Sequence, residues 1–245
     1  MTNTKIIAFS GKKQSGKNTC ANFIYSIYMA KLNLCKKINI NDYGEIEVSD
    51  LLNSKEYAGV FRPEICNSFS EDYILQNTME KINPYIKLYS FADPLKTDIC
   101  MNILGLTHEQ CYGSDDAKNS MTNLQWEDKK LTAREVMQVV GTDILRTMKP
   151  NVWTDAIINK INRDSPSLAL ITDCRFPNEV ECIQNNNGIV VRLSRNVHNS
   201  DHISETILDS KNYNWDKFDY VIENEHMDIY QQSLEIEKIL QEVLS

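Results

Sequence analysis

Short apolar runs alternate along this chain with longer stretches in which apolar residues recur at helical spacing. A run that is apolar throughout is typical of a strand buried in a parallel sheet. The runs predict strands at 6–9, 86–91, 168–173, 189–193 and 219–222. The helical spacing predicts helices at 20 to about 33, 70–81, 92 onwards, 131–145, 152–161, 177–186 and 229–244. This alternation predicts a three-layer α/β fold with a doubly wound parallel sheet of about five strands.

The region after the first helix departs from the alternation. Residues 37–40 and 45–48 alternate polar and apolar side chains on either side of a turn at 41–44, which predicts a β-hairpin. We interpret about 34–84 as an insertion that carries this hairpin. The polar residues 104–130 are predicted to be rich in loops.

The composition is that of an ordinary globular protein, with 42% hydrophobic and 24% charged residues among 245. A net charge of −8 argues against a nucleic-acid polymer as the main partner. No apolar stretch is long enough to cross a membrane, so we expect a cytoplasmic protein without a membrane partner. The seven cysteines include no C-x-x-C pair, which is typical of reduced thiols rather than a zinc site or disulfides.

The loop between the first strand and the first helix has the spacing G-x-x-x-x-G-K at residues 11–17. Strand, loop and helix in this order are the context of a P-loop, in which backbone N–H groups, the helix N-terminus and the lysine attract phosphates. The residue after the lysine is normally Ser or Thr, whose hydroxyl binds Mg²⁺. Here it is Asn18, followed by Thr19. The loop therefore predicts a polyphosphate site and leaves the direct metal contact open.

Polar residues follow the predicted strands at the carboxyl edge of the sheet, where such folds bind ligands. They are Asp93, Asp173, Arg175, Arg195 and Asn224. An Asp at the end of a buried strand holds the Mg²⁺ shell in P-loop enzymes, so Asp173 is the candidate metal ligand. Asp93 has two interpretations: it belongs to the site at this edge beside the P-loop, or it only caps the helix that begins at Pro94.

Two further groups of polar residues indicate a function less specifically. Arg134, Gln138 and Asp143 fall off the apolar face of the helix at 131–145, a position that is usually a solvated surface. The connection at about 195–215 is long and polar, and it contains His198, Asp201, His202 and Glu205. A connection of this length predicts a functional flap.

Five segments in this order resemble the bacteriophage-type deoxynucleoside monophosphate kinases: 11–19, 91–96, 131–143, 173–179 and 202–205. The resemblance covers most of the chain except about 34–84, and Asn before Thr in the P-loop is common in that family. It implies a single P-loop kinase domain over 1–245 that transfers the γ-phosphoryl of ATP to a deoxynucleoside monophosphate. It also implies a substrate-binding helical part at about 93–163 and a lid at about 195–215, which we expect to close over both nucleotides.

The resemblance implies roles for individual residues. ATP is expected to contact Gly11, Ser15, Gly16, Lys17, Asn18, Thr19 and Asn224, with Asn224 bordering the adenine. Lys17, Arg175 and Arg195 are the expected catalytic cations. The two arginines suit this role because a guanidinium group can bind phosphate oxygens in two places. Mg²⁺ is expected at Asp173, with Thr19 or Asn18 as a second contact. The acceptor is expected at Asp93, Arg134, Gln138, Asp143 and Trp153, although Trp153 is equally explained by core packing.

Two other functions fit the same residues. A P-loop kinase of another small acceptor, of the dephospho-coenzyme A or phosphomevalonate type, shares the loop and the sheet. A nucleotide-binding module without catalysis could use the insertion at 34–84 to bind a partner, and Asn18 is the feature that favours it. The expected partners are small nucleotides, the expected location is the host cytoplasm if the gene is a phage gene, and a homodimer is neither required nor excluded.

Overall fold

The structure is a computed structural model that describes residues 4–54, 57–63, 72–197 and 203–244. The chain divides into two units, the first made of 1–89 with 161–245 and the second of 90–160. Among the described residues, no helix combines the length and the apolar character that crossing a membrane requires.

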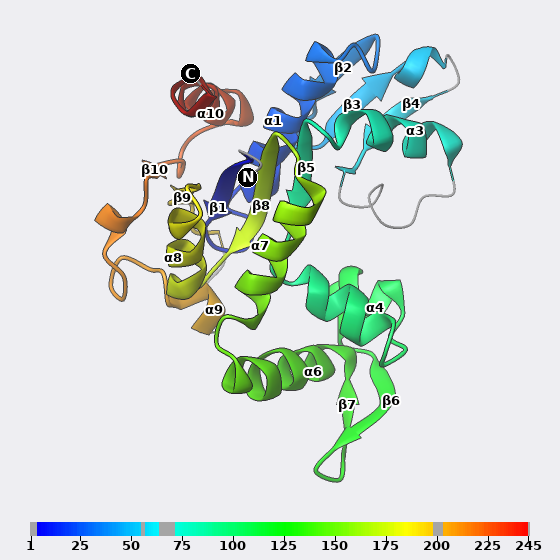
Figure 1. Cartoon of the computed structure of the whole chain (residues 1–245), viewed down its shortest axis with the longest axis vertical. Coiled ribbons are helices and arrows are strands. Elements are labelled where there is room, and N and C mark those ends of the chain that lie inside the picture. The colour runs from blue at the N-terminus through cyan, green and yellow to red at the C-terminus, as the bar shows by residue number, and fades with distance from the viewer. Residues whose placement is uncertain (1–3, 55–56, 64–71, 198–202, 245) are drawn as a thin grey trace. The chain divides into compact units, whose positions relative to one another are not determined.

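A five-stranded parallel sheet lies at the centre of the first unit (Figure 1). The strand order is β10-β9-β1-β8-β5, and every neighbouring pair is parallel. The strands are β1 (Lys5–Ser10), β5 (Ile86–Tyr89), β8 (Leu168–Cys174), β9 (Ile189–Leu193) and β10 (Tyr220–Ile222). The predicted α/β fold and its five strands are confirmed. The chain order reverses beside β1, so the loop that follows β1 lies at the topological switch point where such sheets bind ligands.

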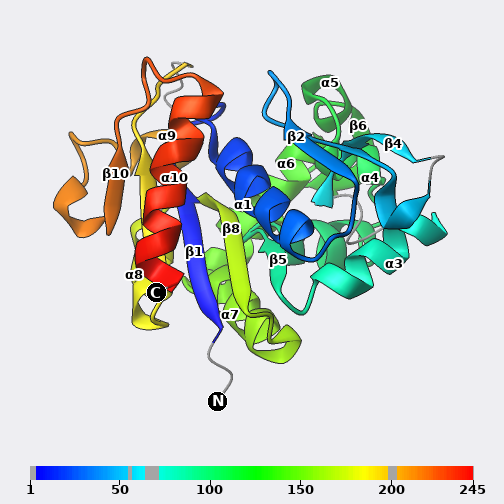
Figure 2. The same cartoon turned by 90° about the horizontal axis from the view of Figure 1, so that it is seen from above.

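Helices cover both faces of this sheet (Figure 2). The helices α1 (Lys17–Lys31) and α10 (Ile229–Leu244) lie on one face, and α8 (Pro177–Asn185) lies on the other. The helices α8 and α10 begin at the predicted residues, whereas α1 begins at Lys17, three residues before its predicted start. In α8, for example, Pro177 is the first residue and the Glu179 carboxylate accepts hydrogen bonds from the backbone N–H groups of Arg175 and Phe176.

The insertion forms a three-stranded antiparallel sheet, β2 (Lys37–Ile40), β3 (Ile46–Ser49) and β4 (Ala58–Phe61), followed by α3 (Tyr73–Ile82). The predicted hairpin is confirmed, and β4 is an additional strand that the sequence pattern did not reveal. The short 3₁₀ helix η1 (Leu51–Asn53) connects the second and third strands. Ile46, Phe61 and Ile82 are buried in one core with residues of β1 and α1. The insertion is therefore built into the core of the first unit and is not an appendage to it.

The turn between β2 and β3 is held against the first turns of α1. The Asn41 side-chain oxygen accepts hydrogen bonds from the backbone N–H groups of Tyr43 and Glu45. Gly44 has a φ of 77°, and a Cβ at this position would lie 2.2 Å from Thr19 Oγ1. The Asn22 side chain also donates to the Gly44 carbonyl oxygen over 2.9 Å. Glycine is required here because the turn approaches the P-loop helix too closely for any side chain.

The second unit has a small core of its own, made of Cys100, Leu106, Cys111, Leu131, Ala133 and Val136. Its elements are η2 (Pro94–Met101), α4 (His108–Tyr112), α5 (Asp115–Lys118), β6 (Met121–Trp126), β7 (Lys129–Thr132), α6 (Ala133–Gln138), η3 (Val139–Arg146) and the first part of α7 (Val152–Asp164). Thr132 and Glu135 form a capping box at the start of α6. The long helix expected at 131–145 is an α-helix that continues as the π-helix η3.

The prediction that 104–130 is mainly loop was wrong. The region contains α4, α5 and the hairpin of β6 and β7. These elements escaped the periodicity analysis because the helices have only five and four residues, and because β6 is mostly exposed. Local signals are nevertheless present: Thr107 and Ser114 cap the two helices, and Glu127 and Asp128 both have the positive φ of a tight hairpin turn.

The close approach of the turn to α1 predicts the effect of Gly44→Ala. A residue with a side chain in this conformation costs about 1–2 kcal/mol, and the contact with Thr19 forces a further backbone shift. We expect the free energy of unfolding to fall by more than the conformational cost alone, as measured by urea denaturation. Gly105→Ala is the matched control, because Gly105 has a φ of 72° with nothing within 4 Å of an added Cβ. Equal losses in the two variants would show that the contact with Thr19 contributes nothing.

Candidate functional site

The P-loop begins at the carboxyl end of β1 and ends in the first turn of α1, where Gly16 is the N-cap with a φ of 101°. A Cβ on Gly16 would lie 2.8 Å from the side-chain amide of Gln232, which comes from α10. The Gln232 side chain also donates to the Gly16 carbonyl oxygen over 3.2 Å. The shape of the loop therefore depends on a glycine that the C-terminal helix presses against.

Lys17 is buried inside this loop, with 7% of its surface exposed. Its Nζ donates hydrogen bonds to the carbonyl oxygens of Gly11 and Lys12, over 2.7 and 2.5 Å. Burial, together with the charges of Arg175 and Arg192 and against the opposing charge of Asp173, lowers the pKa of Lys17 to about 7. The amine is thus held where a P-loop places the phosphates. Its protonation state depends on the charged groups around it.

Asp173 and Arg175 lie at and just after the carboxyl end of β8, where the sequence predicted them. The Arg175 backbone N–H is fixed by the Glu179 carboxylate over 2.7 Å. Its guanidinium Nη1 forms an ion pair with the Glu205 carboxylate. The end of β8 therefore places a carboxylate and a guanidinium next to the P-loop.

Arg195 and Asn224 are tied to one another. The Arg195 guanidinium donates to the Asn224 carbonyl oxygen, from Nε over 3.0 Å and from Nη2 over 2.8 Å, and also to that of Met227. The Asn224 side chain, fully buried, donates to the carbonyl oxygen of Ser15 over 2.8 Å and to the Gln232 side chain over 2.7 Å. Asn224 thus supports the P-loop from behind, and a contact of Asn224 with adenine stays a prediction.

Most of these residues line one cavity of about 1280 Å³ in the first unit. The predicted residues on its wall are Gly16, Lys17, Asn18, Thr19, Asp173, Arg175 and Arg195. Gly11, Ser15 and Asn224 are not on the wall. Gly11 and Ser15 are buried within the loop, and Asn224 is buried behind it. The cavity therefore brings together the cations and the carboxylate that the sequence placed at the sheet edge.

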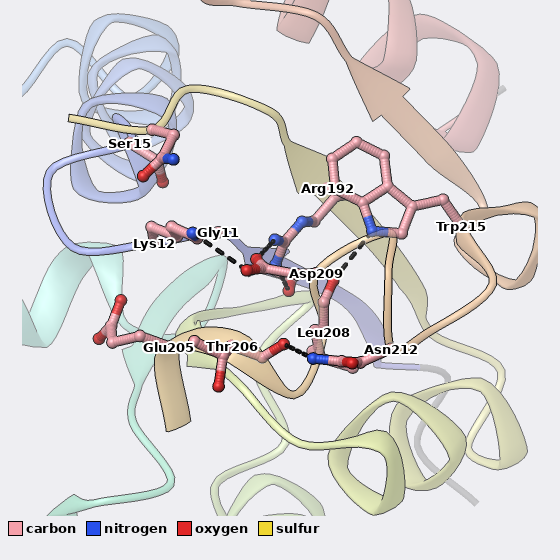
Figure 3. Close-up of polar contacts among 12 residues, drawn as sticks. Gly11, Lys12, Ser15, Arg192, Glu205, Thr206, Leu208, Asp209, Asn212 and Trp215 are labelled. Carbon is pink, nitrogen blue, oxygen red and sulfur yellow. Dashed lines mark hydrogen bonds and ion pairs between the residues drawn. The ribbon is translucent and has the colours of Figure 1, made fainter. Parts of the chain in front are cut away.

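The structure adds a charged cluster that the sequence analysis missed, made of Lys12, Arg192 and Asp209 (Figure 3). Asp209 lies 3.0 Å from Lys12 Nζ and 3.6 Å from Arg192 Nη2. Arg192 is 4% exposed, donates to Ser10 Oγ over 3.0 Å, and has its guanidinium carbon 5.0 Å from the ring centroid of Trp215. Burial lowers the pKa of Arg192. An arginine within an otherwise apolar strand was the sequence signal that could have identified it.

The connection predicted as a lid contacts the P-loop through two acids. Its elements are α9 (Ile203–Thr206) and η4 (Trp215–Lys217). Besides Asp209, it contributes Glu205, whose carboxylate accepts from the backbone N–H of Lys13 over 2.8 Å while it pairs with Arg175. The Trp215 indole N–H donates to the Leu208 carbonyl oxygen over 2.9 Å and braces the segment (Figure 3). The two acids are bound to lysine, arginine and backbone N–H groups, which are the groups that bind phosphate in P-loop proteins. His198, Asp201 and His202 lie outside the described residues.

The residues predicted to bind the acceptor lie in the second unit, and the structure brings only two of them together. Gln138 and Asp143 line a cavity of about 330 Å³ with Trp126, Leu131 and others. Arg134 donates to the side chains of Asn119 and Asp115, each over 2.9 Å.

Asp93 and Trp153 have structural partners of their own. The Asp93 carboxylate accepts from the Tyr112 hydroxyl over 3.0 Å and makes no capping bond to the helix after it. Trp153 is 5% exposed and donates to the Gly141 carbonyl oxygen over 3.0 Å. This environment is that of a packed tryptophan. Base stacking by Trp153 and a substrate contact of Asp93 stay predictions.

Comparison with known proteins agrees with this geometry. Residues 5–232 match the family described as deoxynucleotide monophosphate kinase. A protein of Acanthamoeba polyphaga mimivirus named as a deoxynucleotide monophosphate kinase is 31% identical over 135 residues, which are 49% of this chain and 68% of that protein. The deoxynucleoside-5′-monophosphate kinase of Escherichia phage T5 is 31% identical over 91 residues, which are 33% of this chain and 36% of that protein.

The family match spans the P-loop, the Asp173 and Arg175 segment, the connection with Glu205 and Asp209, and the start of α10. The loop with the P-loop spacing follows β1 at the switch point of the parallel sheet, which is where such folds bind ligands. On the match and on the geometry together, this chain belongs to the deoxynucleotide monophosphate kinase family.

Proposed function

We propose that this protein transfers the γ-phosphoryl group of ATP to a deoxynucleoside 5′-monophosphate. The observation that supports the proposal most directly is the single cavity lined by Lys17, Asp173, Arg175 and Arg195 at the P-loop. Phosphoryl transfer needs alignment and neutralisation of charge rather than covalent chemistry from the protein. Three cations and one carboxylate around a P-loop are suited to that work.

The cavity also fits Mg²⁺. Asp173, Asn18 and Thr19 all line it and offer oxygen ligands, which are those that Mg²⁺ prefers. Bound there, the ion would neutralise charge on the outer phosphates of ATP. The chain itself would hold the phosphates of ATP, because the loop N–H groups and Lys17 would bind the β- and γ-phosphates. Arg175 and Arg195 would face the group in transfer.

Binding of the phosphates requires two exchanges of partner within the chain. Lys17 has to turn from the carbonyl oxygens of Gly11 and Lys12 towards phosphate oxygens. Glu205 has to release Arg175 and the Lys13 N–H, because a phosphate and a carboxylate cannot use the same donors at once. Movement of the lid would then accompany nucleotide binding and exclude water from the site.

Release of ADP tests the reaction. We expect ADP from Mg-ATP with one or more deoxynucleoside monophosphates, and none with dephospho-coenzyme A as a control. Ribonucleoside monophosphates assayed alongside would show whether the 2′-hydroxyl is rejected. Lys17→Ala should lower kcat by at least about a hundredfold with little loss of thermal stability, since it removes a desolvated amine. Release with no deoxynucleotide, from protein that binds ATP, would contradict the proposal and favour a binding module.

The lowered pKa of Lys17 predicts proton uptake on nucleotide binding. With a pKa of about 7 in the free protein, Lys17 is mostly neutral at pH 8. The negative phosphates favour the charged amine and raise its pKa, so binding at pH 8 takes up a proton. Affinity for Mg-ATP should then fall as pH rises above 7, by up to about tenfold per pH unit. Calorimetry in two buffers of different ionisation enthalpy measures the uptake, and Lys17→Ala should abolish it.

The contacts of Glu205 predict that its substitution strengthens nucleotide binding. Glu205→Gln removes the charge that competes with phosphate for Arg175, so the Kd of Mg-ATP should fall by about three- to tenfold, equivalent to about 0.7–1.4 kcal/mol. Glu181→Gln is the matched control, since it removes one negative charge from an exposed residue of α8. Weaker binding in Glu205→Gln would mean that the carboxylate supports the nucleotide instead of competing with it.

A further inference from the structure

The insertion forms one wall of the cavity that contains the P-loop. Residues 38–43, from β2 and the turn after it, line this cavity together with Lys17, Asn18 and Thr19. The first residues of α10, Ile229 and Tyr230, line it as well. Figure 2 shows the β2 hairpin and α10 on opposite sides of α1. The phosphate-binding motif accounts for neither of these walls.

We propose that the insertion binds the nucleoside part of the nucleotide whose phosphates the P-loop holds. The proposal rests on the proposed function for the identity of that ligand, a purine nucleoside triphosphate. The cavity of about 1280 Å³ is larger than the phosphates alone require, since sites that hold whole small molecules measure about 300–1,000 Å³. Space for a complete nucleotide is therefore continuous from the P-loop to the insertion.

The distribution of charge orients the ligand within the cavity. The cations Lys17, Arg175 and Arg195 line its P-loop end. The acids on the other walls are Asp42, from the insertion turn, and Asp228, just before α10. A phosphate beside these carboxylates would be repelled, whereas an uncharged nucleoside would not. The triphosphate therefore lies at the P-loop and the nucleoside between the two outer walls.

The side chains on these outer walls suit a flat aromatic base. Ile38 and Ile40 are half-buried and present apolar surface. Tyr43 is 87% exposed and Tyr230 is 70% exposed, so both rings are available to stack on a ligand. Asn39 is exposed on the same wall and offers a hydrogen-bond donor and acceptor. Stacking of a base on an aromatic side chain is favourable whatever the base.

The insertion wall is held in place before any ligand binds. Gly44 contacts Thr19 of the P-loop helix, and the Asn22 side chain donates to the Gly44 carbonyl oxygen. On the far side of the turn, Glu45 pairs with Arg62 over 2.6 Å. The backbone of the turn that carries Tyr43 is therefore fixed relative to the P-loop, which reduces the backbone entropy lost on binding.

Calorimetric titration of Tyr43→Ala tests the inference, with Mg-ATP and with inorganic tripolyphosphate as ligands. We expect Tyr43→Ala to weaken binding of Mg-ATP by about five- to a hundredfold and to leave tripolyphosphate binding unchanged. Tyr73→Ala is the matched control, because Tyr73 is 75% exposed on α3 of the insertion and does not line the cavity. Tyr230→Ala should behave as Tyr43→Ala does.

The outcomes separate this inference from the proposed function. Unchanged affinity of Tyr43→Ala for Mg-ATP, or equal weakening for tripolyphosphate, would overturn the inference. A raised KM for the deoxynucleoside monophosphate with an unchanged KM for ATP would also overturn it, and the kinase activity would stand. Loss of ATP affinity in Tyr43→Ala, in protein that transfers no phosphoryl group, would support the inference while the proposed function failed. A wild-type protein that binds tripolyphosphate but not ATP would overturn both.

Discussion

Positive charge buried around the loop that follows β1 has to be balanced by acids, and much of this structure depends on how that balance is made. Lys17 and Arg192 are both buried at the loop, and Arg175 adds a third cation. The loss of hydration of Lys17, followed by repulsion from Arg175 and Arg192, disfavours the charged state of the lysine. Asp209 and Glu205 supply the compensating charge, and both come from the connection after β9. The loop and the lid are therefore one electrostatic unit, although they are far apart in sequence.

The segment at 34–84 contributes both to the core of the first unit and to the wall of the P-loop cavity. Its apolar residues join the core around α1, and its turn packs on the first turn of that helix. A segment fixed in this way forms one wall of the cavity beside the P-loop. The first unit thus holds both the P-loop and the segment at 34–84, which lies outside the five segments that carry the resemblance.

The sequence predicted the parts of this protein that repeat a simple pattern or carry a motif. The buried strands, the P-loop helix and α10 were predicted because each has a continuous apolar run or face. The cavity brought Lys17, Asp173, Arg175 and Arg195 together because the carboxyl ends of parallel strands share one edge. The short elements between 104 and 130 were missed because capping and turn chemistry, not periodicity, specify them. Asp209 could not be predicted, since only the folded lid places it between Lys12 and Arg192.

Asn224 and Gln232 support the P-loop, but both are synthesised long after it. Asn224 binds the carbonyl oxygen of Ser15 from 209 residues further along the chain, and Gln232 binds that of Gly16 from 216 residues away. During translation the loop leaves the ribosome long before either support exists. A nascent chain therefore carries the complete P-loop sequence without its final shape. Capture of cellular nucleotides by the motif should begin only when nearly the whole polypeptide has been synthesised.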